Sequence, residues 1–138
     1  MALQETVAFD AENPLMNALG LVHAATEKDT PTAIVVDLDG TIVPHALDSE
    51  DLMGHEPYPG ARETIHAIRK LGVRVIIWTA RGEEMRAMTE YWLSSRNIEF
   101  DELRLDKPKA NLYIDDKALR FVSWSDVIQK VLMPKKLL

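Results

Sequence analysis

The chain has no cysteine among its 138 residues. This absence excludes a disulfide framework, a cysteine-bound zinc ion, an iron–sulfur cluster and catalysis by a thiolate. A reducing compartment suits such a sequence, and we expect a cytoplasmic protein.

Basic residues are also scarce, with 16 Lys and Arg against 22 Asp and Glu, which gives a formal net charge of −6. This balance disfavours a broad basic face, so the sequence carries no strong nucleic-acid signal. The longest apolar runs, residues 33–36 and 75–78, are far too short to cross a bilayer. The first residues lack the basic stretch and apolar core of a secretory signal, and we expect no membrane association.

The remaining composition is typical of one globular domain. Hydrophobic residues make up 46% of the chain and charged residues 28%, close to the averages for folded proteins. Asn13 and Pro14 form a favourable helix start. Apolar residues then follow at helical spacing, at Leu15, Leu19 and Val22. We therefore expect an N-terminal helical extension over residues 1–30 and one main domain over residues 31–138.

Apolar runs and helical periodicities alternate along the main domain. Strands are predicted at residues 33–36, 73–78, 98–105 and 111–114, with a short fifth at 121–122. Helices are predicted from Ala61 to Gly72, after Gly82, and from a capping box formed by Ser123 and Asp126. The alternation indicates an α/β fold, a doubly wound, Rossmann-like parallel sheet with helices on both faces. Trp78, Trp92 and Trp124 stand at positions expected in its core.

Polar residues suited to phosphate chemistry follow three of the predicted strands. They are Asp37 and Asp39 after the first, Thr79 after the second, and Asp115 and Asp116 after the fourth. Ligands of a parallel sheet bind beyond the carboxyl ends of its strands. Four carboxylates at one edge would repel one another unless a cation lay among them, and oxygen ligands favour Mg²⁺. We therefore expect a Mg²⁺ site there.

These residues resemble the four ordered motifs of the haloacid dehalogenase superfamily. The first is DLDGT at residues 37–41, the second Thr79 after an apolar strand, the third Lys107 with Pro108, and the fourth the pair Asp115 and Asp116. The likeness spans residues 33–122. It implies a Mg²⁺-dependent phosphatase that hydrolyses phosphomonoesters.

The resemblance also implies a role for each catalytic residue. Asp37 would be the nucleophile that forms an aspartyl-phosphate. Asp39 would protonate the leaving oxygen and then activate water. The metal ligands would be Asp37, the backbone carbonyl of Asp39, and one or both of Asp115 and Asp116, a choice that strand alternation leaves open.

Further residues would bind the phosphoryl group. Thr79 would donate its hydroxyl, and Lys107 would neutralise the developing charge, with Lys109 as a rival. Gly40 and Thr41 would lie against the substrate because glycine permits a sharp turn and close approach. Arg81, close to Thr79, is a candidate to hold a second anionic group of the substrate, and a surface position at the helix start is its alternative.

The intervals between motifs are short. Residues 44–59 form the first interval, an irregular loop that is too small for the cap domain that many members insert. We therefore expect a capless member with an open site. Its phosphorylated substrate is left open among a small metabolite, a sugar, a nucleotide and a polymer end, and a homo-oligomer remains an alternative.

Two other classes of protein share part of this pattern. A phospho-acceptor receiver domain also uses Asp, Thr, Lys and Mg²⁺, but places its acidic pair first, whereas Asp115 and Asp116 follow both Thr79 and Lys107. A non-catalytic binding protein could keep this fold, since fold alone does not fix function. The presence of every motif residue counts against it. A nucleotide-triphosphate site of the GxxxxGK[ST] kind is excluded because that pattern is missing.

Overall fold

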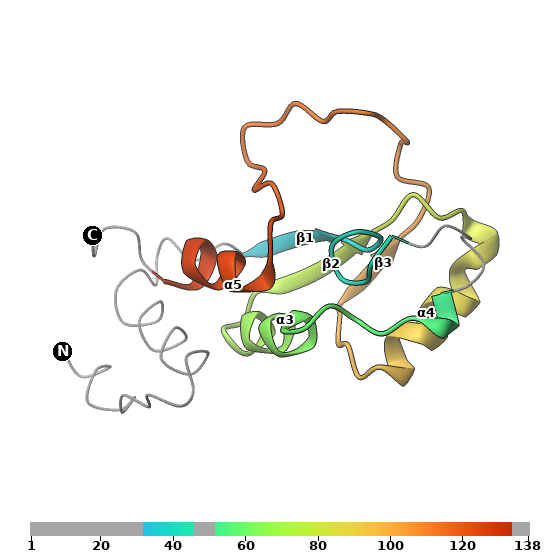
Figure 1. Cartoon of the computed structure of the whole chain (residues 1–138), viewed down its shortest axis with the longest axis horizontal. Coiled ribbons are helices and arrows are strands. Elements are labelled where there is room, and N and C mark those ends of the chain that lie inside the picture. Colours follow the sequence, from blue (N-terminus) through green and yellow to red (C-terminus); the bar gives the residue numbers. More distant parts are fainter. Residues whose placement is uncertain (1–31, 46–51, 134–138) are drawn as a thin grey trace.

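A computed structural model describes residues 32–45 and 52–133. The predicted helix after Asn13 lies outside the described residues. The described chain forms three parallel strands joined by helices, followed by a long excursion and a last helix (Figure 1). None of the helices in these ranges is long and apolar enough to cross a membrane.

The sheet consists of β1 (Ala33–Asp37), β2 (Arg74–Trp78) and β3 (Glu102–Arg104), in the order β1-β2-β3. All pairings are parallel, and the register aligns Asp37 with Trp78 and Trp78 with Arg104. The α/β class is thereby confirmed. Because the strands run in one direction, the residues that follow them meet at one edge.

Two helices connect the strands, α3 (Ala61–Lys70) and α4 (Arg86–Ser95), the second preceded by a short 3₁₀ turn, η3 (Glu83–Met85). Both helices lie below the sheet in Figure 1. Apolar side chains of the strands belong to the same hydrophobic core as those of the two helices. Among them, Val36, Ile77 and Leu103 are aligned across the three strands. The predicted helix from Ala61 is confirmed, and it stops where Gly72 adopts a φ of +86°.

The opposite side of the sheet is less covered. Val35 is 56% exposed, and its neighbour Ile76 is buried but does not belong to the main core cluster. Trp78, on the same side of β2 as Ile76, is only half-buried. The expectation of a core position is therefore wrong for Trp78, whereas Trp92 and Trp124 are core residues.

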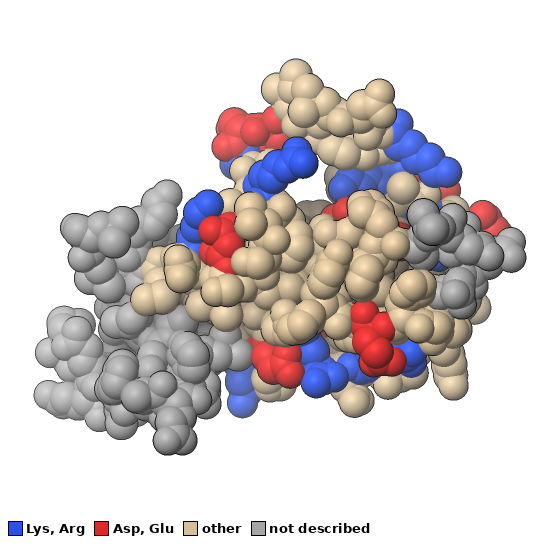
Figure 2. All heavy atoms as spheres, in the orientation of Figure 1, with Lys and Arg blue, Asp and Glu red and all other residues tan. Residues whose placement is uncertain are grey.

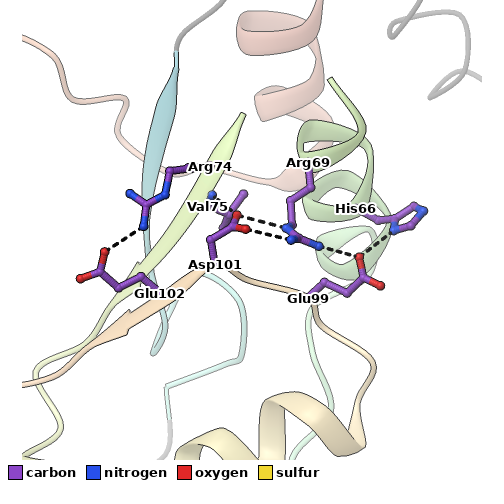
Figure 3. A network of polar contacts seen from close by, with 7 residues as sticks. All are labelled: His66, Arg69, Arg74, Val75, Glu99, Asp101 and Glu102. Carbon is purple, nitrogen blue, oxygen red and sulfur yellow. Dashed lines mark hydrogen bonds and ion pairs between the residues drawn. The ribbon is translucent and has the colours of Figure 1, made fainter. Parts of the chain in front are cut away.

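Asp101 fastens the amino-terminal end of the sheet to α3, as Figure 3 shows. One of its carboxylate oxygens, Oδ2, accepts the Val75 amide at 2.8 Å and the Arg69 Nε at 3.1 Å. The other oxygen accepts Arg69 Nη2 at 2.8 Å. These hydrogen bonds, from the Arg69 guanidinium first and the Val75 amide second, lower the pKa of Asp101 to about 2.

The C-terminal helix begins as predicted. The Ser123 hydroxyl accepts the Asp126 amide at 3.1 Å, and α5 (Trp124–Val127) continues into a π-type turn, η4 (Ile128–Leu132). Trp124 packs against Phe121 with ring centroids 5.3 Å apart. Its indole donates to the Thr41 carbonyl at 2.8 Å, which ties this helix to the loop after β1.

The predicted fourth and fifth strands are not formed. Residues 108–120 are all exposed and form an arc that stands off from the sheet, as seen in Figures 1 and 2. This segment carries several exposed large apolar side chains, among them Leu112 (68%) and Ile114 (93%). The sequence predicted a strand from apolar content alone, and no strand pairing involves these residues in the structure.

The expected loop over residues 44–59 is described only in part. Leu52 is fully buried at the start of a short 3₁₀ turn, η2 (Leu52–Gly54), so the loop contributes to the core. Within the described ranges no further domain is inserted between the strands, which agrees with a capless fold.

Candidate active site

The loop after β1 is a tight turn organised by Leu38. Its carbonyl accepts three successive amides, those of Thr41, Ile42 and Val43, at 3.2, 2.9 and 3.1 Å. The Gly40 amide donates back to the Val43 carbonyl at 2.6 Å. Leu38 is fully buried, so the turn is anchored in the core while its flanking carboxylates remain partly accessible.

Gly40 is required by this turn. Its φ is +85°, a conformation that side chains with a Cβ rarely adopt. A Cβ at this position would also lie only 2.4 Å from the His45 ring nitrogen Nε2. His45 therefore lies directly over the glycine, a contact that the sequence pattern gave no means to predict.

The predicted nucleophile faces a lysine. Lys107 Nζ lies 3.6 Å from Asp37 Oδ1, and the Lys107 side chain is 17% exposed. The Lys107 amide donates to the Thr79 carbonyl at 2.9 Å, which fixes the chain after β3 against the end of β2. Lys109 is exposed, so the geometry favours Lys107 over its rival.

Two aromatic rings flank this lysine. Its ammonium group lies 5.5 Å from the centre of the Trp78 ring and 4.7 Å from that of Tyr113. Such contacts favour the cation through the ring quadrupole. The Tyr113 hydroxyl donates to the carbonyl of Pro108. Sequence reasoning missed both rings at the site, although Trp78 directly precedes Thr79 and is aligned with Asp37.

The segment after β2 is held against the end of β3. The Thr79 amide donates to the Arg104 carbonyl at 2.9 Å, and the Arg81 carbonyl accepts the Asp106 amide at 2.8 Å. The hydroxyl of Thr79 accepts the Arg81 amide at 3.1 Å. Thr79 is fully buried, so in this arrangement its hydroxyl contacts protein atoms only.

Arg81 forms a two-pronged ion pair with Asp39. Its Nε donates to Asp39 Oδ2 at 3.0 Å and its Nη2 to Asp39 Oδ1 at 2.9 Å. The Arg81 side chain is 5% exposed and that of Asp39 27%. The sequence predicted Arg81 as a contact for a second anionic group of the substrate, whereas in the structure its guanidinium is engaged by the carboxylate of Asp39.

The expected gathering of four carboxylates is absent. Asp115 accepts the amide of Lys117 at 2.8 Å, and Asp116 lies 3.9 Å from the Lys117 ammonium, both on the exposed arc. Across residues 32–45 and 52–133, no group of three or more His, Asp or Glu is arranged to hold a metal ion. The residues as they lie therefore do not fit the predicted Mg²⁺ site, because the predicted strand that would carry the late pair is not formed.

Comparison with known proteins gives two likenesses, and no family model matches the chain. Over 72 residues the chain is 35% identical to the sugar-phosphatase AraL of Bacillus subtilis (strain 168). That stretch is 52% of this chain, which therefore spans about a quarter (23%) of its relative's length. A crystal structure from Vibrio cholerae superposes with a TM-score of 0.57 at 25% identity, over 77% of this chain and 92% of that one.

The similarity to these two proteins agrees with the positions of the predicted site residues in the structure. The parallel sheet brings Asp37 of the DLDGT turn beside Lys107, and the buried Thr79 follows the next strand. The sugar-phosphatase belongs to the haloacid dehalogenase family, and the Vibrio cholerae protein is of the same type. The fold, the arrangement of these residues and both relatives support membership of the haloacid dehalogenase superfamily.

Proposed function

We propose that the protein is a phosphomonoester hydrolase that acts through an aspartyl-phosphate at Asp37. The observation that carries the proposal is the pairing of Asp37 with Lys107 at 3.6 Å beside a DLDGT turn. Likeness to a sugar-phosphatase supports the reaction class. A lysine next to the attacking carboxylate offsets charge on the transferred phosphoryl group.

The reaction has two displacements. In the first, a carboxylate oxygen of Asp37 bonds to phosphorus, the bond from phosphorus to the leaving oxygen breaks, and Asp39, which enters this step protonated, gives that oxygen its proton. In the second, Asp39 takes a proton from water, the water oxygen bonds to phosphorus, and the bond to Asp37 breaks. The products are an alcohol and inorganic phosphate, and both aspartates return to their starting state.

Binding of the phosphoryl group is assigned to the surrounding turns. Because the Thr41 amide is already donating to Leu38, we assign the Thr41 contact to its hydroxyl, and close approach to Gly40. Because Thr79 is fully buried, its contact with a phosphoryl oxygen requires the turn of residues 79–82 to open. Lys107 needs no such movement, since it already faces Asp37.

The resemblance implies dependence on Mg²⁺, and superfamily phosphatases generally use it. The described residues do not form a site for the ion, so neither displacement above is routed through it. Dependence of the activity on Mg²⁺ is part of the proposal.

The substrate class is proposed from the sugar-phosphatase likeness and the absence of an inserted cap between the described strands. An uncovered site excludes water poorly and offers few remote contacts, so small phosphates would gain little binding energy. We therefore propose a phosphorylated sugar at the end of a larger molecule as the preferred substrate, with a free sugar phosphate or a nucleotide turned over less efficiently.

The proposal is tested by release of phosphate from p-nitrophenyl phosphate and from a panel of sugar phosphates with added Mg²⁺. Asp37→Asn should lower turnover by about 10³-fold or more while the circular dichroism spectrum is unchanged. Asp126→Asn, on α5, serves as the matched control and should keep wild-type turnover. Borohydride trapping should label the wild type only. A folded Asp37→Asn variant with wild-type turnover would overturn the covalent mechanism.

A further inference from the structure

We infer that Arg81 is a positioning residue that orients the carboxylate of Asp39 for proton transfer, and so sets how strongly the reaction depends on the leaving group. The inference rests on the proposed function. It begins from the two hydrogen bonds, at 3.0 and 2.9 Å, that join the Arg81 fork to both oxygens of Asp39.

The pair is unusual in its burial. The Arg81 side chain is 5% exposed, while the basic partner is at least 17% exposed in each of the other ion pairs recorded for the described residues. A buried cation is costly unless an anion compensates it. The fold therefore pairs this guanidinium with the Asp39 carboxylate, and the planar fork fixes the plane of that carboxylate.

Arg81 and Asp39 both lie in turns that are held by backbone hydrogen bonds. The backbone of Arg81 is held at its amide by Thr79 and at its carbonyl by Asp106. Asp39 lies in the turn that closes on the Leu38 carbonyl, next to Gly40 with its φ of +85°. The ion pair thus bridges the loops after β1 and β2, so the Asp39 carboxylate is fixed relative to the nucleophile two residues away.

Proton transfer remains available in this arrangement. An ionised carboxylate has about four acceptor positions, and the Arg81 fork uses two of them. One lone pair on each oxygen is left for the proton that passes to the leaving oxygen. Transfer of that proton matters for an alkoxide, which is a poor leaving group, and little for p-nitrophenolate.

The first test compares the wild type with Arg81→Lys, which keeps the charge and loses the fork. We expect kcat for a sugar or other alkyl phosphate to fall about 10²-fold, and kcat for p-nitrophenyl phosphate to fall less than about fivefold. KM should change little for either. Arg96→Lys, a part-buried arginine paired with Glu56 away from the site, is the matched control and should leave the ratio of the two rates unchanged.

A second test asks whether the effect passes through Asp39. Introduced into Asp39→Asn, the Arg81→Lys change should cause no further loss on alkyl phosphates, because the group that it positions has already lost its function. Arg81→Ala should show the same selective loss, with partial recovery when guanidinium ion is added.

The outcomes separate this inference from the proposed function. Equal losses on aryl and alkyl phosphates, a raised KM without a change in kcat, or a full further loss in the Asp39→Asn background would each overturn the role of Arg81 while leaving the phosphatase intact. Failure of both Arg81 variants to fold would assign the residue to the fold alone. A wild-type protein that releases no phosphate would overturn the proposed function and, with it, this inference.

Discussion

At the scale of single residues, Gly40 and Gly72 provide a matched pair. Both have a positive φ, +85° and +86°, but a Cβ at Gly40 would meet the His45 ring whereas one at Gly72 would meet nothing within 4 Å. Gly72→Ala should therefore lower the free energy of unfolding by about 1–2 kcal/mol, the cost of the left-handed backbone. Gly40→Ala should lower it further, as measured by urea denaturation.

The additional decrease in the free energy of unfolding that we expect for Gly40→Ala, compared with Gly72→Ala, should come from the clash with the His45 ring. In a His45→Ala background, the cost of Gly40→Ala should approach that of Gly72→Ala, because only the backbone strain remains. If the two glycine substitutions cost the same in the wild-type background, the His45 ring moves aside freely and does not constrain the turn.

The resemblance favoured Lys107 over Lys109 because Pro108 follows it, and the structure supplies a physical reason for that choice. Both lysines follow β3 and differ by two positions. The structure separates them because the Lys107 amide is bonded to the Thr79 carbonyl, which brings that side chain between Trp78 and Tyr113 and toward Asp37. This position depends on the register between two strand ends, a physical cause that the Lys107–Pro108 pattern does not itself contain.

At the scale of elements, Asp101 joins α3 to the sheet, and its effect should depend on pH. The folded-state pKa is about 2, below the ordinary value of 3.8. A lowered pKa means that the stabilisation is complete above about pH 4 and is lost as the pH falls toward 2. Asp101→Asn should thus lower the free energy of unfolding by about 1–2 kcal/mol at pH 7, and by less at pH 3.

Urea denaturation of both proteins at pH 7, 5 and 3 measures this difference. Glu90→Gln, which removes an exposed ion pair with Arg86 on α4, is the control and should cost about 0.5 kcal/mol or less at pH 7. A difference between wild type and Asp101→Asn that stays constant from pH 7 to pH 3 would show that the ionised carboxylate does not fasten α3.

Elements with strong periodicity or a clear cap were predictable. The helix from Ala61 and the capping box at Ser123 are present as expected, since local spacing and local hydrogen bonds determine them. The run at residues 98–105 is shortened to β3 because only residues 102–104 find partners on β2. Strand formation requires a neighbouring edge, and the sequence of one strand does not contain that information.

At the scale of the whole molecule, sheet topology explains which site residues meet. The resemblance implied that Lys107 lies near the phosphoryl group attacked by Asp37, and the two side chains lie 3.6 Å apart because the segments that follow parallel strands share one edge. The Arg81 pair with Asp39 was not predicted, since it depends on the shapes of two turns. Acidic and basic side chains are interspersed over the face seen in Figure 2, so net charge alone would not have located either pair.

The late acidic pair gives the last prediction, which concerns the exposed arc. If Asp115 and Asp116 bind Mg²⁺ together with Asp37, residues 111–116 must move to the end of β1, and the exposed Leu112 and Ile114 would lose contact with water. Mg²⁺ should then raise Tm, because an ion bound only by the folded state stabilises it by about 2.7 kcal/mol at a hundred times its Kd. Calorimetry with and without Mg²⁺, at matched ionic strength, measures the shift.

Hydrogen exchange tests the movement itself. Amides of residues 111–116 should exchange quickly without Mg²⁺ and slowly with it, because strand pairing protects them. The double change Asp115→Asn and Asp116→Asn should remove both the Tm shift and the protection, while Asp106→Asn, an exposed residue outside the pair, should keep both. A shift that persists in the double variant would mean that Mg²⁺ binds elsewhere. Protection without added Mg²⁺ would mean that the segment docks through its apolar side chains alone, which the 93% exposure of Ile114 argues against.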